Sequence, residues 1–212
     1  MIRWNIAQWF EKRWWKDYLS KQNAAEYIQW KERYWHLFIQ KIGIHVLPNQ
    51  VIYDYGCGPA GINIIYPEHA VYAVDPLIED YQRDYPALFP PSKIVYSNST
   101  IEDFKPTVLG DWIFSINCIN HVNDLEAALA IIAQSGKEDA TYIISTDLHS
   151  TGFFNFILKY LPFDILHPIQ LNYEEYMEDF HASGLVVERS IKLKTKWMFE
   201  YWVFVLKKHS SN

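Results

Sequence analysis

An acidic residue and three glycines lie close together in the stretch Asp54-Tyr55-Gly56-Cys57-Gly58-Pro59-Ala60-Gly61. Glycines let the chain turn tightly and let its backbone approach a ligand. The stretch follows a strand-like run and precedes a segment that we expect to be helical, so free N–H groups would lie behind the loop. Nineteen residues after Gly56, a second strand-like run ends at Asp75, where a carboxylate can accept both hydroxyls of a ribose. The spacing therefore predicts a nucleoside-binding site.

The three glycines, Gly56, Gly58 and Gly61, also fit the dinucleotide fingerprint of nicotinamide-dependent enzymes. Three features disfavour that interpretation. Asp54 would repel a pyrophosphate and would instead face a cationic or amine-bearing ligand. Pro59 removes a backbone donor from the loop, and we expect no second domain to hold a hydride donor or acceptor. An NAD-dependent oxidoreductase is therefore the weaker alternative.

A sheet must position this loop. Short runs rich in Val, Ile, Tyr and Phe alternate with helix-length segments at 51–55, 70–74, 93–97, 111–117 and 141–146. This alternation is typical of βαβ units and a parallel sheet. A helix predicted over 173–182 is followed by strand-like runs at 185–194 and 197–207, which only two residues separate, so they should pair as an edge hairpin. The predicted fold class is α/β, a Rossmann-like seven-stranded mostly parallel sheet with an antiparallel last strand.

The first 36 residues have a composition of their own. They contain six of the nine tryptophans and carry a net charge of +3, with seven Lys or Arg against four Asp or Glu. Hydrophobic residues recur every four positions from Ile6 to Tyr18, and Asn23 followed by Glu26 is typical of a helix start. We therefore predict an aromatic-rich helical cap over residues 1–46 and the main, ligand-binding domain over 47–212. Packing of the cap on that domain is the favoured interpretation, and contact with a membrane surface is the weaker alternative.

Composition limits the classes of function. The 212 residues are 50% hydrophobic and contain no run of 18 uncharged apolar residues and no basic-then-apolar leader, so we expect a cytoplasmic protein. Two cysteines, Cys57 and Cys118, cannot form a disulfide framework or a zinc site on their own, and we expect no metal. A net charge of −6 argues against a dedicated nucleic-acid binder.

With its loop, its acidic residue after the second strand and its order of elements, the sequence resembles the class I S-adenosylmethionine-dependent methyltransferases of the small-molecule type, over roughly residues 47–207. The resemblance implies S-adenosyl-L-methionine as the cofactor. It places Asp54 near the methionine amino group and Asp75 at the ribose. The other residues that it places at the cofactor are Gly56, Cys57, Gly58, Pro76, Leu77, Thr100, Ile101, Glu102, Asn117 and Cys118. Ala60 stands where the family's third glycine is usual.

Two histidines are candidates for catalysis. Methyl transfer needs alignment of the acceptor, and it needs a general base when the acceptor carries a proton of high pKa. His121 follows the fourth predicted strand and His149 follows the fifth, so both should lie at the carboxyl edge of the sheet, where open α/β sheets bind ligands. A structural role for His121, capping the following helix, is the alternative.

We thus predict methyl transfer to a small-molecule acceptor that the sequence does not identify. An aromatic-rich insertion at 151–170 could roof an apolar pocket together with the N-terminal helices. A polar or sugar acceptor remains open, because core packing explains each aromatic residue equally well. The alternative from another class is a methyltransferase-like protein that binds its cofactor or a partner without turnover.

Overall fold

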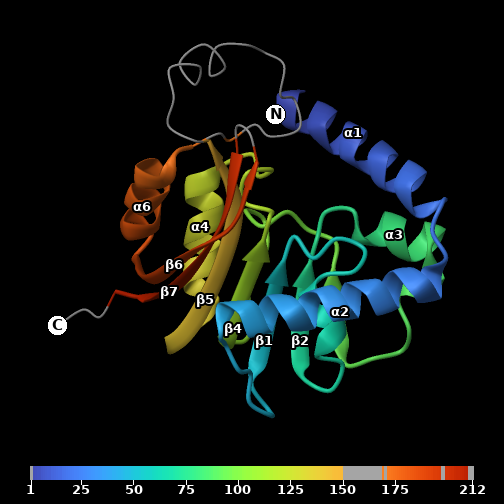
Figure 1. Ribbon diagram of the computed structural model, residues 1–212, viewed down its shortest axis with the longest axis horizontal. Coiled ribbons are helices and arrows are strands. Elements are labelled where there is room, and N and C mark those ends of the chain that lie inside the picture. Colours follow the sequence, from blue (N-terminus) through green and yellow to red (C-terminus); the bar gives the residue numbers. More distant parts are fainter. Residues whose placement is uncertain (1, 150–168, 170, 197–198, 210–212) are drawn as a thin grey trace.

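One mixed sheet organises the chain (Figure 1). The computed structural model describes residues 2–149, 169, 171–196 and 199–209, and the side chains of these residues except those of 2–5, 149 and 196. In this part of the chain the sheet has the order β3-β2-β1-β4-β5-β7-β6. Its strands are β1 Val51–Tyr55, β2 Ala70–Val74, β3 Ile94–Ser97, β4 Gly110–Ile116, β5 Gly136–His149, β6 Leu185–Lys196 and β7 Phe199–Lys208.

Only β7 runs against the other strands. It pairs antiparallel with both β5 and β6, whereas β1 pairs parallel with β2 and β4, β2 with β3, and β4 with β5. The predicted fold class and the predicted edge hairpin are therefore confirmed. β5 is longer than the predicted run at both ends, because it pairs with β4 from Gly136 and with β7 as far as His149.

Helices cover both faces of the sheet. They are α1 Ile2–Leu19, α2 Ala24–Ile42, α3 Ile78–Asp84, α4 Leu125–Gln134 and α6 Tyr173–Ala182, with short 3-10 helices η1 Ile62–Ile65 and η2 Pro86–Leu88. α2 crosses one face of the sheet, and α4 and α6 lie on the other face (Figure 1). None of the described helices is long and apolar enough to cross a membrane.

The alternation of side chains along β1 determines what each face holds. Ile52 packs with Trp35, Phe38 and Ile42 of α2, whereas Tyr53 and its alternate neighbours pack with α4 and α6. Successive residues of a strand point to opposite faces. Asp54 therefore lies on the same face as Ile52, toward α2.

The two predicted N-terminal helices are present. Asn23 caps α2 as expected, because its side chain accepts hydrogen bonds from Ala25 N at 3.0 Å and Glu26 N at 3.2 Å. α2 ends at Gly43, which has a left-handed backbone. α2 packs directly on the sheet, as the favoured interpretation of the aromatic segment required. The proposed domain boundary between residues 46 and 47 falls between α2 and β1.

The helix predicted directly after the glycine loop is wrong. Only the four-residue η1 follows Gly61. Pro67 disfavours helical backbone in Tyr66, and three of the four residues in the Ile-Asn-Ile-Ile sequence are β-branched, which lowers their helix propensity. α2 covers this part of the sheet instead, in contact with η1.

Candidate functional site

The glycine loop is bound to the end of β2 and packed against the segment after β4. Gly56 N donates to Val74 O at 2.8 Å. The φ of Gly56 is +68°, and a Cβ at this position would collide with the Cys118 side chain. A Cβ on Gly61 would likewise collide with the Asp54 carboxylate and the Cys57 carbonyl. Gly61 thus allows the loop backbone to pack closely against Asp54. The resemblance places this role at the family's third glycine, where this chain has Ala60.

Asp54 is a buried carboxyl at the end of β1, with 2% of its surface exposed. One oxygen accepts a hydrogen bond from Asn63 N at 3.0 Å. Burial raises the pKa of Asp54 to about 7, although the Asn63 hydrogen bond and the nearby Lys31 oppose this increase. The carboxyl therefore favours a ligand group that carries positive charge or donates hydrogen bonds.

Asp75 lies on the other side of the loop, directly after β2, and is 8% exposed. Its two oxygens accept hydrogen bonds from Gly58 N and Leu77 N, each at 2.9 Å. Burial raises the pKa of Asp75 to about 6, against the effect of these two hydrogen bonds. Asp75 thereby holds the loop closed, while its remaining lone pairs can accept from a ligand.

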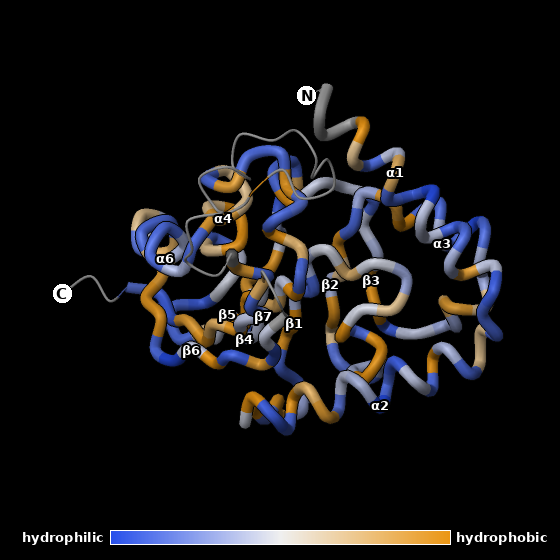
Figure 2. Tube along the Cα trace, turned by 45° about the horizontal axis from the view of Figure 1, so that its top comes forward, coloured by the Kyte–Doolittle hydropathy of each residue, from blue (hydrophilic) through white to orange (hydrophobic). Residues whose placement is uncertain are grey.

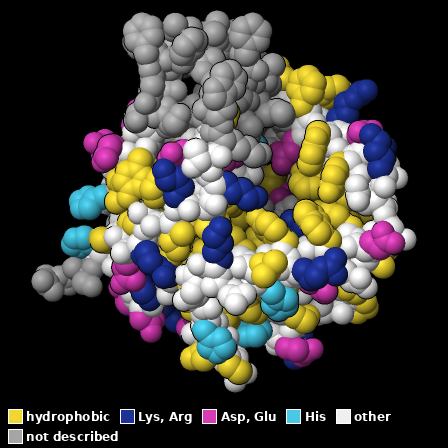
Figure 3. Space-filling view, in the orientation of Figure 1, with side chains coloured by type: hydrophobic (Ala, Val, Ile, Leu, Met, Phe, Trp, Pro, Cys, Tyr) yellow, Lys and Arg dark blue, Asp and Glu magenta, His cyan; other side chains and the backbone are white. Residues whose placement is uncertain are grey.

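A cavity of about 730 Å³ opens along the loop at the carboxyl edge of the sheet. Figure 3 shows a hollow on this face, with hydrophobic side chains gathered around it. Twelve predicted site residues line the cavity: Asp54, Gly56, Cys57, Gly58, Asp75, Pro76, Thr100, Ile101, Glu102, Asn117, Cys118 and His121. Leu77 does not line the cavity. Its side chain packs in a buried cluster with Ile78 and Tyr81, and its backbone N–H donates to Asp75.

Two other predictions cannot be placed in the cavity. His149 ends β5, but its side chain lies outside the described residues. Most of the insertion at 151–170 also lies outside them.

The segment after β3 is fixed by local hydrogen bonds. Thr100 Oγ1 donates to the Asp103 carboxylate at 2.8 Å. The Glu102 carboxylate accepts from Asn123 N at 2.8 Å and Asp124 N at 3.1 Å, which joins this segment to the start of α4. Both side chains thus bind their own chain here, and Ile101 adds an apolar wall between them.

His121 lies in the turn between β4 and α4 and lines the cavity. The backbone N–H of His121 donates to the backbone carbonyl oxygen of Cys118 at 2.9 Å. α4 is capped by Asp124, whose side chain accepts from Ala127 N at 3.0 Å. The helix cap proposed as the alternative role of His121 therefore belongs to Asp124. Burial raises the pKa of the Cys118 thiol, which favours its protonated form over the thiolate that a nucleophile requires.

Two charged residues of the N-terminal helices also reach the cavity, and the sequence interpretation did not identify them. Glu11 of α1 lies near Asp75, and burial, followed by the charge of Asp75, raises the pKa of Glu11 to about 7. Lys31 of α2 lies near Asp54, and burial lowers the pKa of Lys31 to about 8. The signal that identifies them is helical spacing. Lys31 lies four positions from each of the buried residues Tyr27 and Trp35, and Glu11 lies four positions from the buried Ala7 and from the half-buried Trp15.

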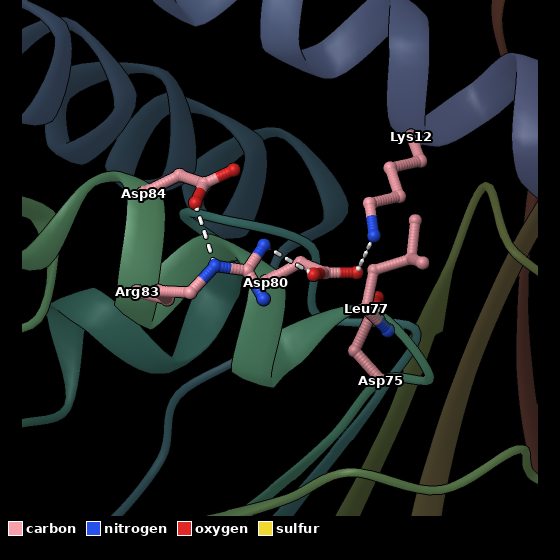
Figure 4. Close-up of polar contacts among 6 residues, drawn as sticks. All are labelled: Lys12, Asp75, Leu77, Asp80, Arg83 and Asp84. Carbon is pink, nitrogen blue, oxygen red and sulfur yellow. Dashed lines mark hydrogen bonds and ion pairs between the residues drawn. The ribbon is translucent and has the colours of Figure 1, made fainter.

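α1 is fastened to α3 beside the cavity. Figure 4 shows the Lys12 ammonium paired with the Asp80 carboxylate, which Arg83 also contacts. The Lys12 Nζ and Asp80 Oδ2 atoms are 2.6 Å apart. Tyr85 OH donates to Lys16 O at 2.9 Å, and the ring of Trp15 packs edge-on against Tyr81. These contacts hold Glu11 over the side of the cavity where Asp75 lies.

No group of three or more His, Cys, Asp or Glu side chains among the described residues could hold a metal ion.

The comparisons with known proteins find similarity in structure alone. No protein-family model matches the sequence, and no curated protein matches it. Phosphoethanolamine N-methyltransferase 2 from Haemonchus contortus, solved with phosphomonomethylethanolamine and S-adenosylhomocysteine, superposes with a TM-score of 0.66 at 14% identity, over 82% of this chain and 52% of that one. The present chain thus spans about half the length of that structure.

Two further solved structures match most of their own length. The 1,6-didemethyltoxoflavin-N1-methyltransferase of Burkholderia thailandensis has a TM-score of 0.61 at 14% identity, over 99% of this chain and 88% of that one. The geranyl diphosphate C-methyltransferase of Streptomyces coelicolor has a TM-score of 0.62 at 12% identity, over 81% and 77%. The chain therefore has the fold of the class I S-adenosylmethionine-dependent methyltransferases.

Proposed function

We propose that the protein transfers a methyl group from S-adenosylmethionine to a small-molecule acceptor. The observation that carries this proposal is the pair of buried carboxyls, Asp54 and Asp75, on the two sides of one glycine loop in one cavity. Asp54 suits an ammonium, and Asp75 suits the hydroxyls of a ribose. The two groups are separate parts of the same cofactor, so one ligand would contact both.

The loop geometry disfavours a dinucleotide. Gly58 N is already bound to Asp75, so this N–H is not available to a pyrophosphate. The four-residue η1 stands where a dinucleotide site needs the N-terminus of a full helix. Asp54 beside the loop would repel the phosphate charges. These three observations support a cationic nucleoside over NAD.

The acceptor would lie on the side of the cavity away from Asp75. The aromatic side chains of Trp30, Tyr34, Phe199 and Tyr201 line the cavity, as does His121. Phe199 and Tyr201 belong to β7, which β1, β4 and β5 separate from β2, the strand that Asp75 follows. The cofactor supplies an electrophilic methyl group on a sulfonium. The chain's task is to orient the acceptor and exclude water, and His121 would take the acceptor's proton where the acceptor has one to lose.

Calorimetric titration tests the proposal. We expect binding of S-adenosylmethionine and S-adenosylhomocysteine and no response to NADH. Binding of NADH with no response to either sulfur nucleoside would refute it. A screen of phenols, hydroxy acids, amines and sugars for release of S-adenosylhomocysteine would then identify the acceptor, and cofactor binding without any turnover would favour a non-catalytic binding protein.

A further inference from the structure

α2 buries a regular stripe of side chains against the sheet and the glycine loop. The stripe contains Tyr27, Trp35, Phe38 and Ile42, and Lys31 occupies the position between Tyr27 and Trp35. Residues four apart share one face of a helix. A lysine on such a face loses hydration, and this loss must be offset by something that it binds. Figure 2 shows how hydrophobic and hydrophilic residues alternate along α2.

The place of Lys31 is fixed by its neighbour one turn along the helix. Trp35 Nε1 donates to Ala60 O, in the glycine loop, at 3.1 Å. This buried hydrogen bond holds α2 in register with the loop. Lys31 consequently projects into the cavity near Asp54, which lies on the α2 face of β1.

The Lys31 ammonium is surrounded by rings. It lies 4.5 Å from the ring centroid of Trp35, 5.6 Å from that of Tyr34 and 5.8 Å from that of Trp30. Cation–π contacts of this kind attract the ammonium to the ring faces but use none of its three N–H groups as conventional hydrogen-bond donors. Among the described residues, no carboxylate forms an ion pair with Lys31.

We infer that Lys31 binds the carboxylate of the cofactor's amino-acid end while Asp54 binds the ammonium of the same group. This inference rests on the proposed function. An α-amino acid carries both charges on one carbon, so its binding site needs an anion and a cation side by side but not paired with each other. Asp54 and Lys31 meet that requirement, and they make the site selective for a zwitterionic ligand over a nucleoside that lacks the carboxylate.

The test compares two ligands that differ only in that carboxylate: S-adenosylhomocysteine and its decarboxylated analogue, S-adenosyl-3-thiopropylamine. We expect wild-type protein to bind S-adenosylhomocysteine about 10- to 100-fold more tightly, the range for a hydrogen bond to a charged group. Lys31→Met should lose this preference, because the substitution weakens the binding of S-adenosylhomocysteine and leaves the binding of the decarboxylated analogue unchanged. Lys31→Arg, which keeps the charge, should retain most of it.

Lys41→Met is the matched control, since Lys41 lies on the same helix but is exposed and outside the cavity. It should bind both ligands as wild type does. An undiminished preference in Lys31→Met would overturn the inference and leave the proposed function intact. Equal binding of the two ligands by wild type would also overturn it, and this measurement needs no variant to fold. Failure of wild type to bind either ligand would refute the proposed function itself.

Discussion

Asp54 should make the free protein less stable as the pH rises. In the unfolded chain its carboxyl ionises near its usual pKa of 3.8, whereas burial raises the pKa of Asp54 in the folded protein to about 7. Between these two values the unfolded chain releases a proton that the folded protein keeps. The free energy of unfolding should therefore decrease as the pH rises from about 4 to about 7, and it should change no further above that range.

The size of this decrease follows from the difference between the two pKa values. One pKa unit corresponds to about 1.4 kcal/mol, so the difference between 3.8 and about 7 amounts to roughly 4 kcal/mol at most. In Asp54→Asn the neutral amide keeps an acceptor for Asn63 N but removes the titrating group. Lys31 loses a nearby negative charge in this variant, which reduces the gain. We expect Asp54→Asn to gain about 2–4 kcal/mol relative to wild type between pH 4 and pH 8.

Urea unfolding of both proteins at pH 4, 6 and 8, without ligand, measures this difference. Other titrating groups are common to the two proteins, so most of their contribution cancels. Asp17→Asn is the control, because Asp17 has an exposed side chain and pairs with Lys21 on the surface, where such a pair contributes below about 1 kcal/mol. Parallel pH profiles for wild type and Asp54→Asn would refute the reasoning, because they would mean that Asp54 ionises in the folded protein as it does in the unfolded chain.

Three further substitutions test the site. Asp75→Ala should weaken binding of S-adenosylhomocysteine by about 1–3 kcal/mol, since it removes a ribose acceptor and leaves Gly58 N without its partner; unchanged calorimetric affinity would place the ribose elsewhere. His121→Asn should keep cofactor affinity while lowering turnover about 10²- to 10⁴-fold if His121 is a general base, and wild-type turnover in the variant would exclude that role. Gly56→Ala should lower the free energy of unfolding by at least about 1 kcal/mol, because of its positive φ and the collision with Cys118; wild-type stability in urea would contradict this.

The sheet and its carboxyl edge could be predicted from the sequence because both depend on local patterns. The buried strands are short apolar runs, and β1 and β2 begin and end at the predicted residues. Residues directly after parallel strands lie at the same carboxyl edge of the sheet, however the strands are connected. This rule brings Asp54, Asp75 and His121 to one cavity, although they are up to 67 positions apart in the chain.

The parts that could not be predicted depend on contacts between elements. The segment after Gly61 has room for a helix by length, but it forms only η1, and α2 from the N-terminal segment covers the sheet there. The sequence pattern does not single out Glu11 and Lys31, because aromatic residues dominate their helices. A charged residue in the middle of a buried stripe is the local signal, but its partner on the loop becomes visible only when the helix is placed on the sheet.

Four of the charged groups that line the cavity have one physical property in common. Burial raises the pKa of Glu11, Asp54 and Asp75 and lowers that of Lys31, so each group is shifted toward its neutral form in the absence of a ligand. A ligand with an ammonium, a carboxylate and a ribose would supply partners for these charges. It would lower the raised pKa values of the carboxyls and raise the lowered pKa of Lys31. Binding should then change the protonation of the site, and the observed enthalpy at pH 7 should depend on the ionisation enthalpy of the buffer. A surface that merely tolerated these residues as packing would show no such dependence, because no proton would be exchanged when the ligand binds.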